Sequence, residues 1–191
     1  MKKVIFTTLL IFATSSTLSA RGGHGQHLGQ GGGGHSHKNY NSSVVYELTQ
    51  EQKDDLIFMY QEEKLARDVY ITLGEKWGSQ VFLNIQKSEQ KHMDAIKSLL
   101  DKYSLTPPVS NDNIGSFANE ELQSLYNDLI AKGNLSLNDA LEVGVTIEET
   151  DIADLKDKIE GVPSDIERVY SRLLRGSDNH LSAFNKALEG V

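Results

Sequence analysis

The stretch FLNIQKSEQKHMDAIKSLL, residues 82–100, decides the fold class. Its apolar residues recur every three or four positions, which is the period of one buried face of an α-helix. The same face carries Glu89 and His92, which are three residues apart and therefore neighbours on it. Because this period continues through most of the chain from Leu48 onward, residues 44–191 are predicted to form one all-α domain.

Four long helices and one short helix are predicted from this period and from capping residues. The first helix opens with the capping box Thr49-Gln-Glu-Gln52. The last opens at Pro163-Ser164, where Glu167 is expected to close a second capping box. Pro107-Pro108 ends the second helix and begins a long connection that contains the short helix. The predicted ranges are residues 49–77, 79–103, 116–132, 136–161 and 163–188.

The connections between the helices predict the topology. Gly78-Ser79 is a short turn, which forces the second helix to lie antiparallel to the first. A second short turn joins the last two helices. Two tight hairpins joined by a long crossover with one short helix indicate a ferritin-like four-helix bundle.

Acidic and histidine residues interrupt the buried face halfway along each long helix. A buried carboxylate is costly unless it is paired or bound to metal, so interruptions at matching depth on four helices indicate a shared cation. Carboxylates and imidazoles on facing helices bind iron or manganese, and in Glu-x-x-His the acid can bridge two metals. The predicted metal ligands are Glu63, Glu89, His92, Glu148, Asp151 and His180.

Two of these ligands have neighbours that suit the same face. Glu62 competes with Glu63, and Glu149 competes with Glu148, because one residue shifts the helix position by only about 100°. The alternative to metal binding is a degenerate bundle in which the polar layer is a hydrogen-bonded network.

The residues around the predicted ligands resemble those of known families. Glu63-Lys-Leu-Ala-Arg-Asp-Val-Tyr70 resembles the first-helix motif Glu-x-x-Ala-Arg-x-x-Tyr of rubrerythrins, and Glu89-Gln-Lys-His92 resembles their Glu-x-x-His. Glu148-Glu-Thr-Asp151 is similar to their Glu-x-x-Glu. A closer resemblance, from about Leu48 to Leu188, is to a bacterial and archaeal ferritin-like family known as a domain of unknown function. The resemblance implies a ferritin-like fold but no established reaction.

The last long helix departs from the rubrerythrin pattern. Its histidine is preceded by Ser177 where a rubrerythrin has a carboxylate, and Asp178 lies about 100° off the inward face. The chain has no cysteine for a rubredoxin-type iron site. Because Ser177 stands in place of that carboxylate, whether one metal or two bind stays open.

Two segments precede the predicted domain. Residues 1–20, with Lys2 and Lys3 before a short apolar run, are predicted to be a secretory signal cleaved after Ala20 or Ser19. The protein is therefore expected to be exported, to the periplasm or the exterior, without a membrane span. Residues 21–43 are predicted to be a disordered, glycine-rich tether. Its histidines, which either collect zinc, copper or nickel weakly or are simply solvated, are His24, His27, His35 and His37.

Composition narrows the functions further. The absence of cysteine excludes thiolate zinc sites and iron–sulfur clusters, and a net charge of −8 argues against nucleic acid as a partner. The expected function is that of a di-iron or di-manganese protein that oxidises iron(II) or reduces peroxide or dioxygen. Tyr60 or Tyr70, on the same face as Glu63, would hydrogen-bond a ligand or else be ordinary core. The alternative is a non-catalytic metal- or partner-binding module, and a homodimer is left open.

Overall fold

The computed structural model describes residues 46–107 and 112–191. These residues form five α-helices and no β-strand, which confirms the all-α prediction. The predictions for residues 1–20 and 21–43 lie outside the described residues. The helices are α1 (Gln50–Trp77), α2 (Gln80–Lys102), α3 (Glu120–Gly133), α4 (Leu137–Lys158) and α5 (Ser164–Leu188).

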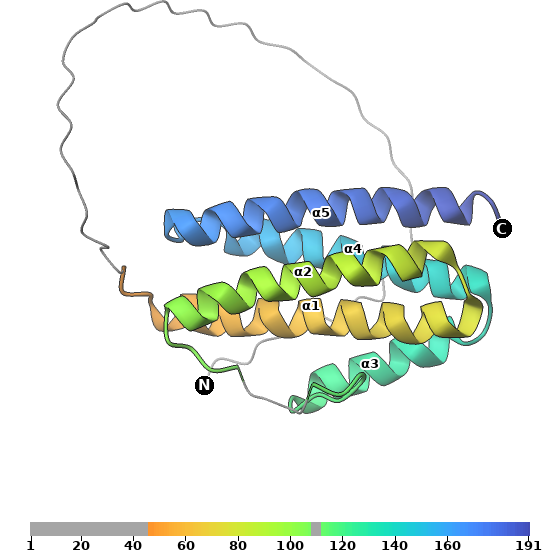
Figure 1. The fold of residues 1–191 in the computed structure, drawn as a ribbon, viewed down its shortest axis with the longest axis horizontal. Coiled ribbons are helices and arrows are strands. Elements are labelled where there is room, and N and C mark those ends of the chain that lie inside the picture. The colour runs from red at the N-terminus through yellow and green to blue at the C-terminus, as the bar shows by residue number, and fades with distance from the viewer. Residues whose placement is uncertain (1–45, 108–111) are drawn as a thin grey trace, which may run out of the picture. The chain divides into compact units, whose positions relative to one another are not determined.

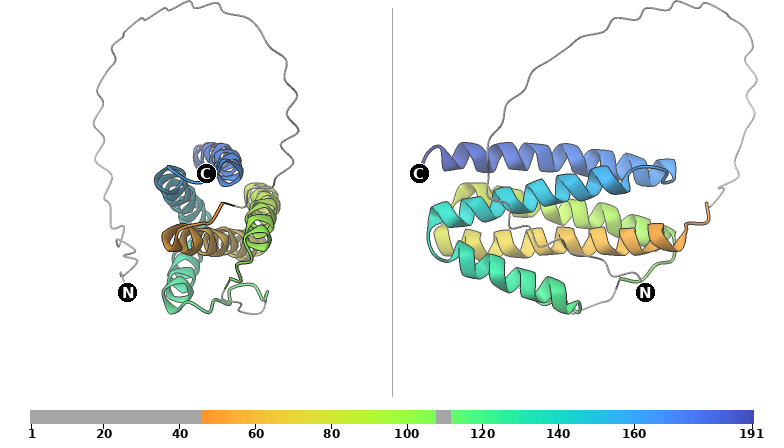
Figure 2. Two further views of the ribbon diagram at one scale, coloured as in Figure 1. Left: turned by 90° about the vertical axis from the view of Figure 1, so that its left-hand side faces the viewer. Right: turned by 180° about the vertical axis from the view of Figure 1, so that it is seen from behind.

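The four long helices pack as two antiparallel hairpins, α1 with α2 and α4 with α5 (Figure 1). The hairpins meet where α2 packs on α5 and α1 packs on α4. The end-on view in Figure 2 shows these four helices around a common centre, with α3 outside them. Helix α3 contacts α1 and α4, and with its flanking loops it forms the crossover between the hairpins.

Helix α1 begins and ends at the residues that the sequence predicted. The Thr49 hydroxyl accepts a hydrogen bond from the Gln52 amide at 3.2 Å, and the Gln52 side chain accepts one from the Thr49 amide at 3.1 Å. Gly78 ends the helix in the left-handed region at φ 63°, a conformation that glycine adopts without steric cost. The sharp turn that follows lets α2 begin at once.

Two other helix starts correct the sequence prediction. Pro163 is the N-cap of α5, so Ser164 is already the first helical residue and no side-chain capping bond forms. The predicted second capping box is therefore wrong. The short helix begins at Glu120 rather than Ser116, because the Asn119 side chain accepts hydrogen bonds from the next two free amides, those of Glu121 and Leu122.

Two apolar layers enclose the middle of the long helices. The first lies where α1 and α5 begin and α2 and α4 end, and it includes Leu56, Met59 and Ile96. At the other end of the helices the rings of Tyr70, Phe82 and Phe184 pack with centroids 5.1 to 5.9 Å apart. The predicted metal ligands lie between these two layers and are buried.

A buried charged cluster fixes the crossover to α1. Asp68 is fully buried and accepts hydrogen bonds from Lys64 at 2.5 Å, from Arg67 at 2.9 Å and from the Gly115 amide at 3.0 Å. Lys64 also reaches the Asn113 carbonyl at 3.1 Å. The charged residues of the Glu63–Tyr70 motif therefore hold residues 113–115 against α1, a role that the sequence did not indicate.

Asp68→Asn should lower the free energy of unfolding by about 2 kcal/mol, because it replaces two charge-assisted hydrogen bonds by weaker ones. Urea denaturation measures this loss. Asp128→Asn, a surface substitution on α3, is the control and should be within about 0.5 kcal/mol of wild type. Equal destabilisation by both substitutions would contradict the role given to Asp68.

Candidate metal centre

The six predicted ligands are buried on four different helices, at the level between the two apolar layers. Their exposed fractions run from 2% to 9%. We call these residues the Glu/His cluster. They are Glu63 on α1, Glu89 and His92 on α2, Glu148 and Asp151 on α4, and His180 on α5.

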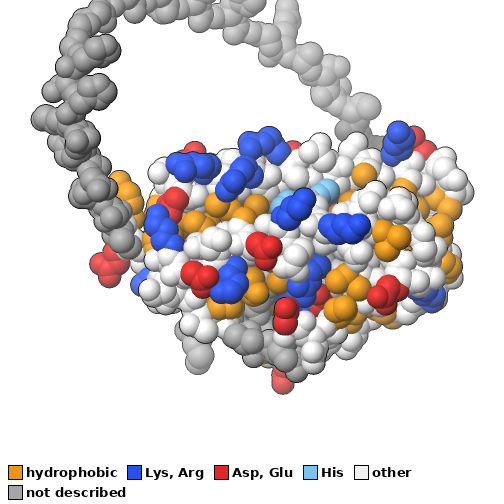
Figure 3. Space-filling model, in the orientation of Figure 1, with side chains coloured by type: hydrophobic (Ala, Val, Ile, Leu, Met, Phe, Trp, Pro, Cys, Tyr) orange, Lys and Arg blue, Asp and Glu red, His pale blue; other side chains and the backbone are white. Residues whose placement is uncertain are grey.

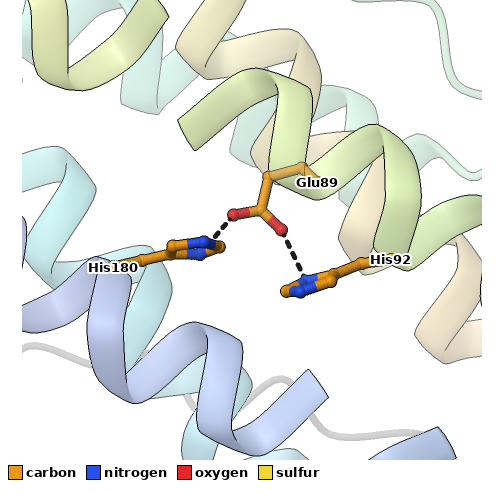
Figure 4. Close-up of side chains that lie close together, drawn as sticks. All are labelled: Glu89, His92 and His180. Carbon is orange, nitrogen blue, oxygen red and sulfur yellow. Dashed lines mark ion pairs between the residues drawn. The ribbon is translucent and has the colours of Figure 1, made fainter. Parts of the chain in front are cut away.

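The carboxylate of Glu89 bridges the two imidazole rings, with one oxygen directed at each, as Figure 4 shows. Its Oε2 is 2.9 Å from Nδ1 of His92, and its Oε1 is 2.7 Å from Nδ1 of His180. The rings are stacked with centroids 5.4 Å apart. One ligand atom from each of these three residues can be chosen so that all lie within 4.8 Å of one another, which is a spacing that a metal ion can bridge.

A second carboxylate lies near the same ring nitrogen of each histidine that Glu89 contacts. Glu63 Oε2 lies 3.3 Å from Nδ1 of His92, and Glu148 Oε2 lies 3.5 Å from Nδ1 of His180. The arrangement is thus two similar halves, each with one imidazole and one carboxylate of its own, which share the carboxylate of Glu89.

Asp151 does not contact either histidine directly. Its Oδ2 accepts a hydrogen bond from the Ser177 hydroxyl at 2.5 Å, and Ser177 is fully buried. Asp151 nevertheless lies close enough to act electrostatically on both Glu63 and His92. The serine that replaces the expected carboxylate on α5 therefore orients a carboxylate from α4.

Several buried ligand atoms have no hydrogen-bond partner among the described residues. They include Glu63 Oε1, Asp151 Oδ1, Glu89 Oε1 and His180 Nδ1. The last two are within ion-pair distance of each other, but their angles are not those of a hydrogen bond. Buried polar atoms without partners are rare in folded proteins, and carboxylate oxygens with imidazole nitrogens form a donor set suited to iron, manganese or zinc. The residues present therefore fit a bound cation.

Tyr70 supports the cluster from the aromatic layer. Its hydroxyl donates a hydrogen bond to Glu148 Oε1 at 2.7 Å and lies 3.4 Å from the Gly144 carbonyl oxygen. Tyr60 instead lines a surface pocket with Lys97 and Asp112. Of the two tyrosines considered from the sequence, only Tyr70 hydrogen-bonds a predicted ligand.

Gly176 leaves space for the ring of His92, a role that could not be predicted from the sequence. A Cβ at position 176 would lie 2.5 Å from His92 Nε2 and 2.7 Å from Cε1, both too close for van der Waals contact. Since the opposite ring nitrogen of His92 faces Glu63 and Glu89, the backbone of α5 limits how far this ring can withdraw from them.

Gly176→Ala should lower the affinity for manganese(II) by about 10- to 100-fold, because it displaces a ligand side chain. Because alanine has a higher helix propensity than glycine, the substitution should at the same time stabilise helix α5 by up to about 1 kcal/mol. Isothermal titration of the variant with manganese(II) measures the first effect. Gly190→Ala, whose Cβ would meet only one atom at 3.5 Å, is the control. Unchanged affinity in Gly176→Ala would contradict this packing role.

Burial raises the pKa of the acids of the Glu/His cluster other than Glu89. The pKa of Glu148 rises to about 8 and that of Asp151 to about 6. Burial also raises the pKa of Glu63 well above its ordinary value, and the Asp151 carboxylate adds to this shift. The metal-free protein therefore holds protons on some of these acids.

The contacts around Glu89 have the opposite effect. Burial alone would raise its pKa, but His180 and His92 outweigh burial and lower the pKa to about 2. Burial alone would lower the pKa of each histidine, but the neighbouring carboxylates raise it to about 11 for His92 and about 9 for His180. At neutral pH the metal-free protein accordingly has two imidazolium ions beside one carboxylate.

The metal-free protein should lose at least about 2 kcal/mol of stability, about 5 °C in melting temperature, as pH rises from about 5 to 9. The protonated histidines stabilise the folded state fully below the pKa of an unfolded histidine. This stabilisation is lost as pH rises through the folded-state pKa values, about 9 for His180 and about 11 for His92. The raised pKa of Glu148 acts in the same direction up to about pH 8. The lowered pKa of Glu89 has the opposite effect on stability. It acts only in acid, below the pKa of an unfolded glutamate, where stability is lost as pH falls toward about 2.

Melting curves at several pH values, recorded with a chelator and with saturating manganese(II), check this prediction. The stabilisation that manganese(II) provides should grow as pH rises, because the ligands must release protons to bind the cation. A metal-free protein that becomes more stable from pH 5 to 9 would contradict it.

The two alternative acids have different environments. Glu149 is exposed on α4. Glu62, in contrast, is only 9% exposed, because every residue of α1 from Gln61 to Tyr70 is buried. Burial raises the pKa of Glu62 well above its ordinary value, and Asp154 and Asp151 add to that shift. Among the described residues Glu62 forms no ion pair with either histidine, so it lies beside the Glu/His cluster rather than in it.

The histidines border the seam between α2 and α5. Their side chains are 11% exposed for His92 and 10% for His180. Figure 3 shows histidine surface on this face, with lysine and arginine side chains around it. None of the helices in residues 46–107 and 112–191 combines the length and apolar character that a membrane crossing requires.

Comparison with known proteins finds both a family and a close structural neighbour. A family model described as an uncharacterised protein domain, DUF2202, matches residues 52–191. The uncharacterised protein MJ0754 of Methanocaldococcus jannaschii is 52% identical over 142 residues, which cover 74% of this chain and 77% of that protein. The crystal structure of hypothetical protein MJ0754 from Methanococcus jannaschii has a TM-score of 0.75 at 50% identity, covering 78% and 86% of the two chains.

A more distant solved structure shares the fold. The crystal structure of a DUF305 fragment from Deinococcus radiodurans has a TM-score of 0.56 at 16% identity, and the match covers 75% of this chain and 98% of the fragment. Identity this low shows a similar arrangement of helices and nothing about activity.

Proposed function

This chain belongs to the DUF2202 family of uncharacterised domains, and from the geometry of its Glu/His cluster we propose that it is a ferritin-like metalloprotein. It holds two divalent cations, iron or manganese. Glu63 and His92 would hold one cation, Glu148 and His180 would hold the other, and Glu89, which contacts both histidines, would contribute to both. Asp151 completes the negative charge of the site.

The observation that carries this proposal is the contact between Glu89 Oε1 and His180 Nδ1. These atoms are 2.7 Å apart, both are buried, and neither has a hydrogen-bond partner. A donor and an acceptor that close would normally align. Two buried ligand atoms this close, without an aligned hydrogen bond between them, can serve one cation together once His180 releases its proton.

The protein contributes fixed ligands, a dry surrounding and proton acceptors. Tyr70 holds Glu148 and Ser177 holds Asp151, so two of the carboxylates are oriented before a cation arrives. The apolar layers on both sides exclude water. Bound iron or manganese supplies Lewis acidity and redox capacity. The reaction we propose is oxidation of iron(II) or reduction of peroxide or dioxygen, in a protein exported by residues 1–20.

Metal analysis of the full chain with its tail histidines replaced by alanine tests the site. We expect about two manganese(II) or iron(II) ions per chain after equilibrium dialysis. Loss of all bound metal with the tail histidines would contradict the proposal, because the ions would then belong to residues 21–43. The substituted residues are His24, His27, His35 and His37.

Oxidation of iron(II) under oxygen or peroxide tests the reaction. The rate per bound iron should exceed that of iron(II) in buffer, and Glu89→Gln should remove the difference. A rate equal to that of the buffer, with two ions bound, would leave a binding protein without this activity.

A non-catalytic helical module remains the second candidate, and one observation favours it. Without any cation, Glu89 already forms ion pairs with both His92 and His180. A polar network that neutralises itself needs no metal to be tolerated in a helical core. Equal melting temperatures with and without iron(II), manganese(II) or zinc(II) would favour this candidate.

A further inference from the structure

Glu62 and Asp154 lie beside the Glu/His cluster without forming part of it. Glu62 is 9% exposed, and its Oε2 has no hydrogen-bond partner among the described residues. The carboxylates that act on it most strongly are Asp154 and Asp151 of α4, and Asp154 is within hydrogen-bond reach. Asp151 presents a second buried and unpartnered oxygen, Oδ1. Buried acceptors of this kind call for a positive charge, and the described residues supply only that of Lys158, which pairs with Asp154.

These carboxylates form a row from the surface to the interior. The Asp154 side chain is 30% exposed, Glu62 and Asp151 are each 9% exposed, and Glu63 is 2% exposed. Asp151 and Asp154 are three residues apart on α4 and thus neighbours on one face. The row follows the contact between α1 and α4, which are adjacent in both views of Figure 2.

We propose that Glu62, Asp154 and Asp151 form a loading site, which holds a divalent cation on its way from solvent to the Glu/His cluster. This inference rests on the proposed function, because a loading site needs a destination. Oxygen-only ligands suit a hard, partly hydrated cation in transit, whereas the mixed oxygen and nitrogen ligands of the Glu/His cluster retain it. Asp151, next to both groups, receives the cation from Glu62.

Lys158 is the charge that a cation must displace. Its ammonium lies 3.4 Å from Asp154 Oδ1 and 5.4 Å from the centroid of the Phe58 ring. A single, loosely paired lysine on a flexible side chain neutralises only part of three carboxylates. Asp55, on which Lys158 also acts, adds negative charge on the outer side of the same seam.

The opposite side of the long helices is less suited to cations. The groove between α2 and α5, about 520 Å³ in volume, is lined by Lys102, Arg168 and Arg172 against Asp94 and Asp165. Lysine and arginine side chains also surround the histidine surface in Figure 3. Like charges slow the approach of a cation there, so the acidic seam between α1 and α4 is the favoured route.

Stopped-flow mixing with cobalt(II) tests the loading site. The visible absorption of bound cobalt(II) gives the rate at which the cation reaches its ligands. The full chain is used, with its four tail histidines replaced by alanine. Glu62→Gln and Asp154→Asn should each slow loading at least about 10-fold at low salt while leaving the final number of bound ions unchanged. Glu149→Gln and Asp178→Asn, matched changes at exposed positions, should load at the wild-type rate.

The outcomes separate this inference from the proposed function. Loading of both variants at the wild-type rate, with full occupancy, would overturn the loading site alone. Fewer ions bound at equilibrium in Glu62→Gln would also overturn it, because Glu62 would then be a permanent ligand. No cobalt(II), manganese(II) or iron(II) bound by the unsubstituted Glu/His cluster would overturn the proposed function and the loading site together. Circular dichroism verifies that each variant is folded.

Discussion

Saturating manganese(II) should raise the free energy of unfolding by about 4 kcal/mol for each bound cation, and therefore by about 8 kcal/mol for two, or roughly 20 °C in melting temperature, at a thousandfold excess over the dissociation constant. The cation binds only the folded chain, because the ligands come from four helices. It also replaces the protons and ion pairs by which the metal-free protein neutralises its buried acids. Differential scanning calorimetry with and without manganese(II), at one pH, measures the gain.

Two histidine substitutions separate the Glu/His cluster from the tail in that experiment. His92→Ala removes a ligand and should lose most of the gain, whereas His24→Ala should lose none. The metal-free stability of His92→Ala provides a second check. This variant should be less stable than wild type, because Glu63 and Glu89 each lose the imidazolium that they contact. Equal gains in His92→Ala and wild type would exclude His92 as a ligand.

Glu89→Gln should reduce manganese(II) affinity by at least about 1,000-fold, which corresponds to about 4 kcal/mol. Glutamine keeps the shape of the side chain but removes the charge that contacts both imidazoles. Since both halves of the site share this carboxylate, both cations should be lost together rather than one at a time. Isothermal titration of the variant gives the affinity and the number of ions bound.

Glu149→Gln is the matched control, because Glu149 is an exposed glutamate on α4 with the same change of charge. Its affinity should equal that of wild type at physiological ionic strength, where exposed charges are largely screened. Retention of one ion at full affinity in Glu89→Gln would show that the two halves are independent, which contradicts a shared carboxylate.

The helices and the depth of the polar residues could be predicted from the sequence. Helical period and capping are local properties, so the start of α1 at the Thr49 cap and its end at Gly78 could be read directly. Glu89 and His92 share one face of one helix whatever surrounds it. Their burial follows from the apolar residues above and below them in the same stripe.

Choices between adjacent residues could not be predicted, because they depend on neighbouring helices. A helical wheel selects either Glu62 or Glu63, but both are buried, since α2, α3 and α4 all pack on α1. The bond from Ser177 to Asp151 and the space that Gly176 leaves for His92 depend on how far α5 is displaced along its neighbours. That displacement is set by packing across the whole interface and not by any local pattern.

The charged part of the Glu63–Tyr70 motif had a structural reason that spacing did not reveal. Lys64, Arg67 and Asp68 would be expected on the outer face of an isolated helix. The crossover covers that face, and Asp68 is the buried acceptor that holds it. Charged side chains on a helix face that a long connecting segment covers can therefore be buried.

Anomalous diffraction from crystals of the full chain grown with manganese(II), recorded on both sides of the manganese absorption edge, tests the central claim most directly. The proposal predicts two anomalous peaks beside the Glu89 carboxylate, one toward His92 and one toward His180. Crystals with manganese(II) in excess that show no peak among these residues would contradict it.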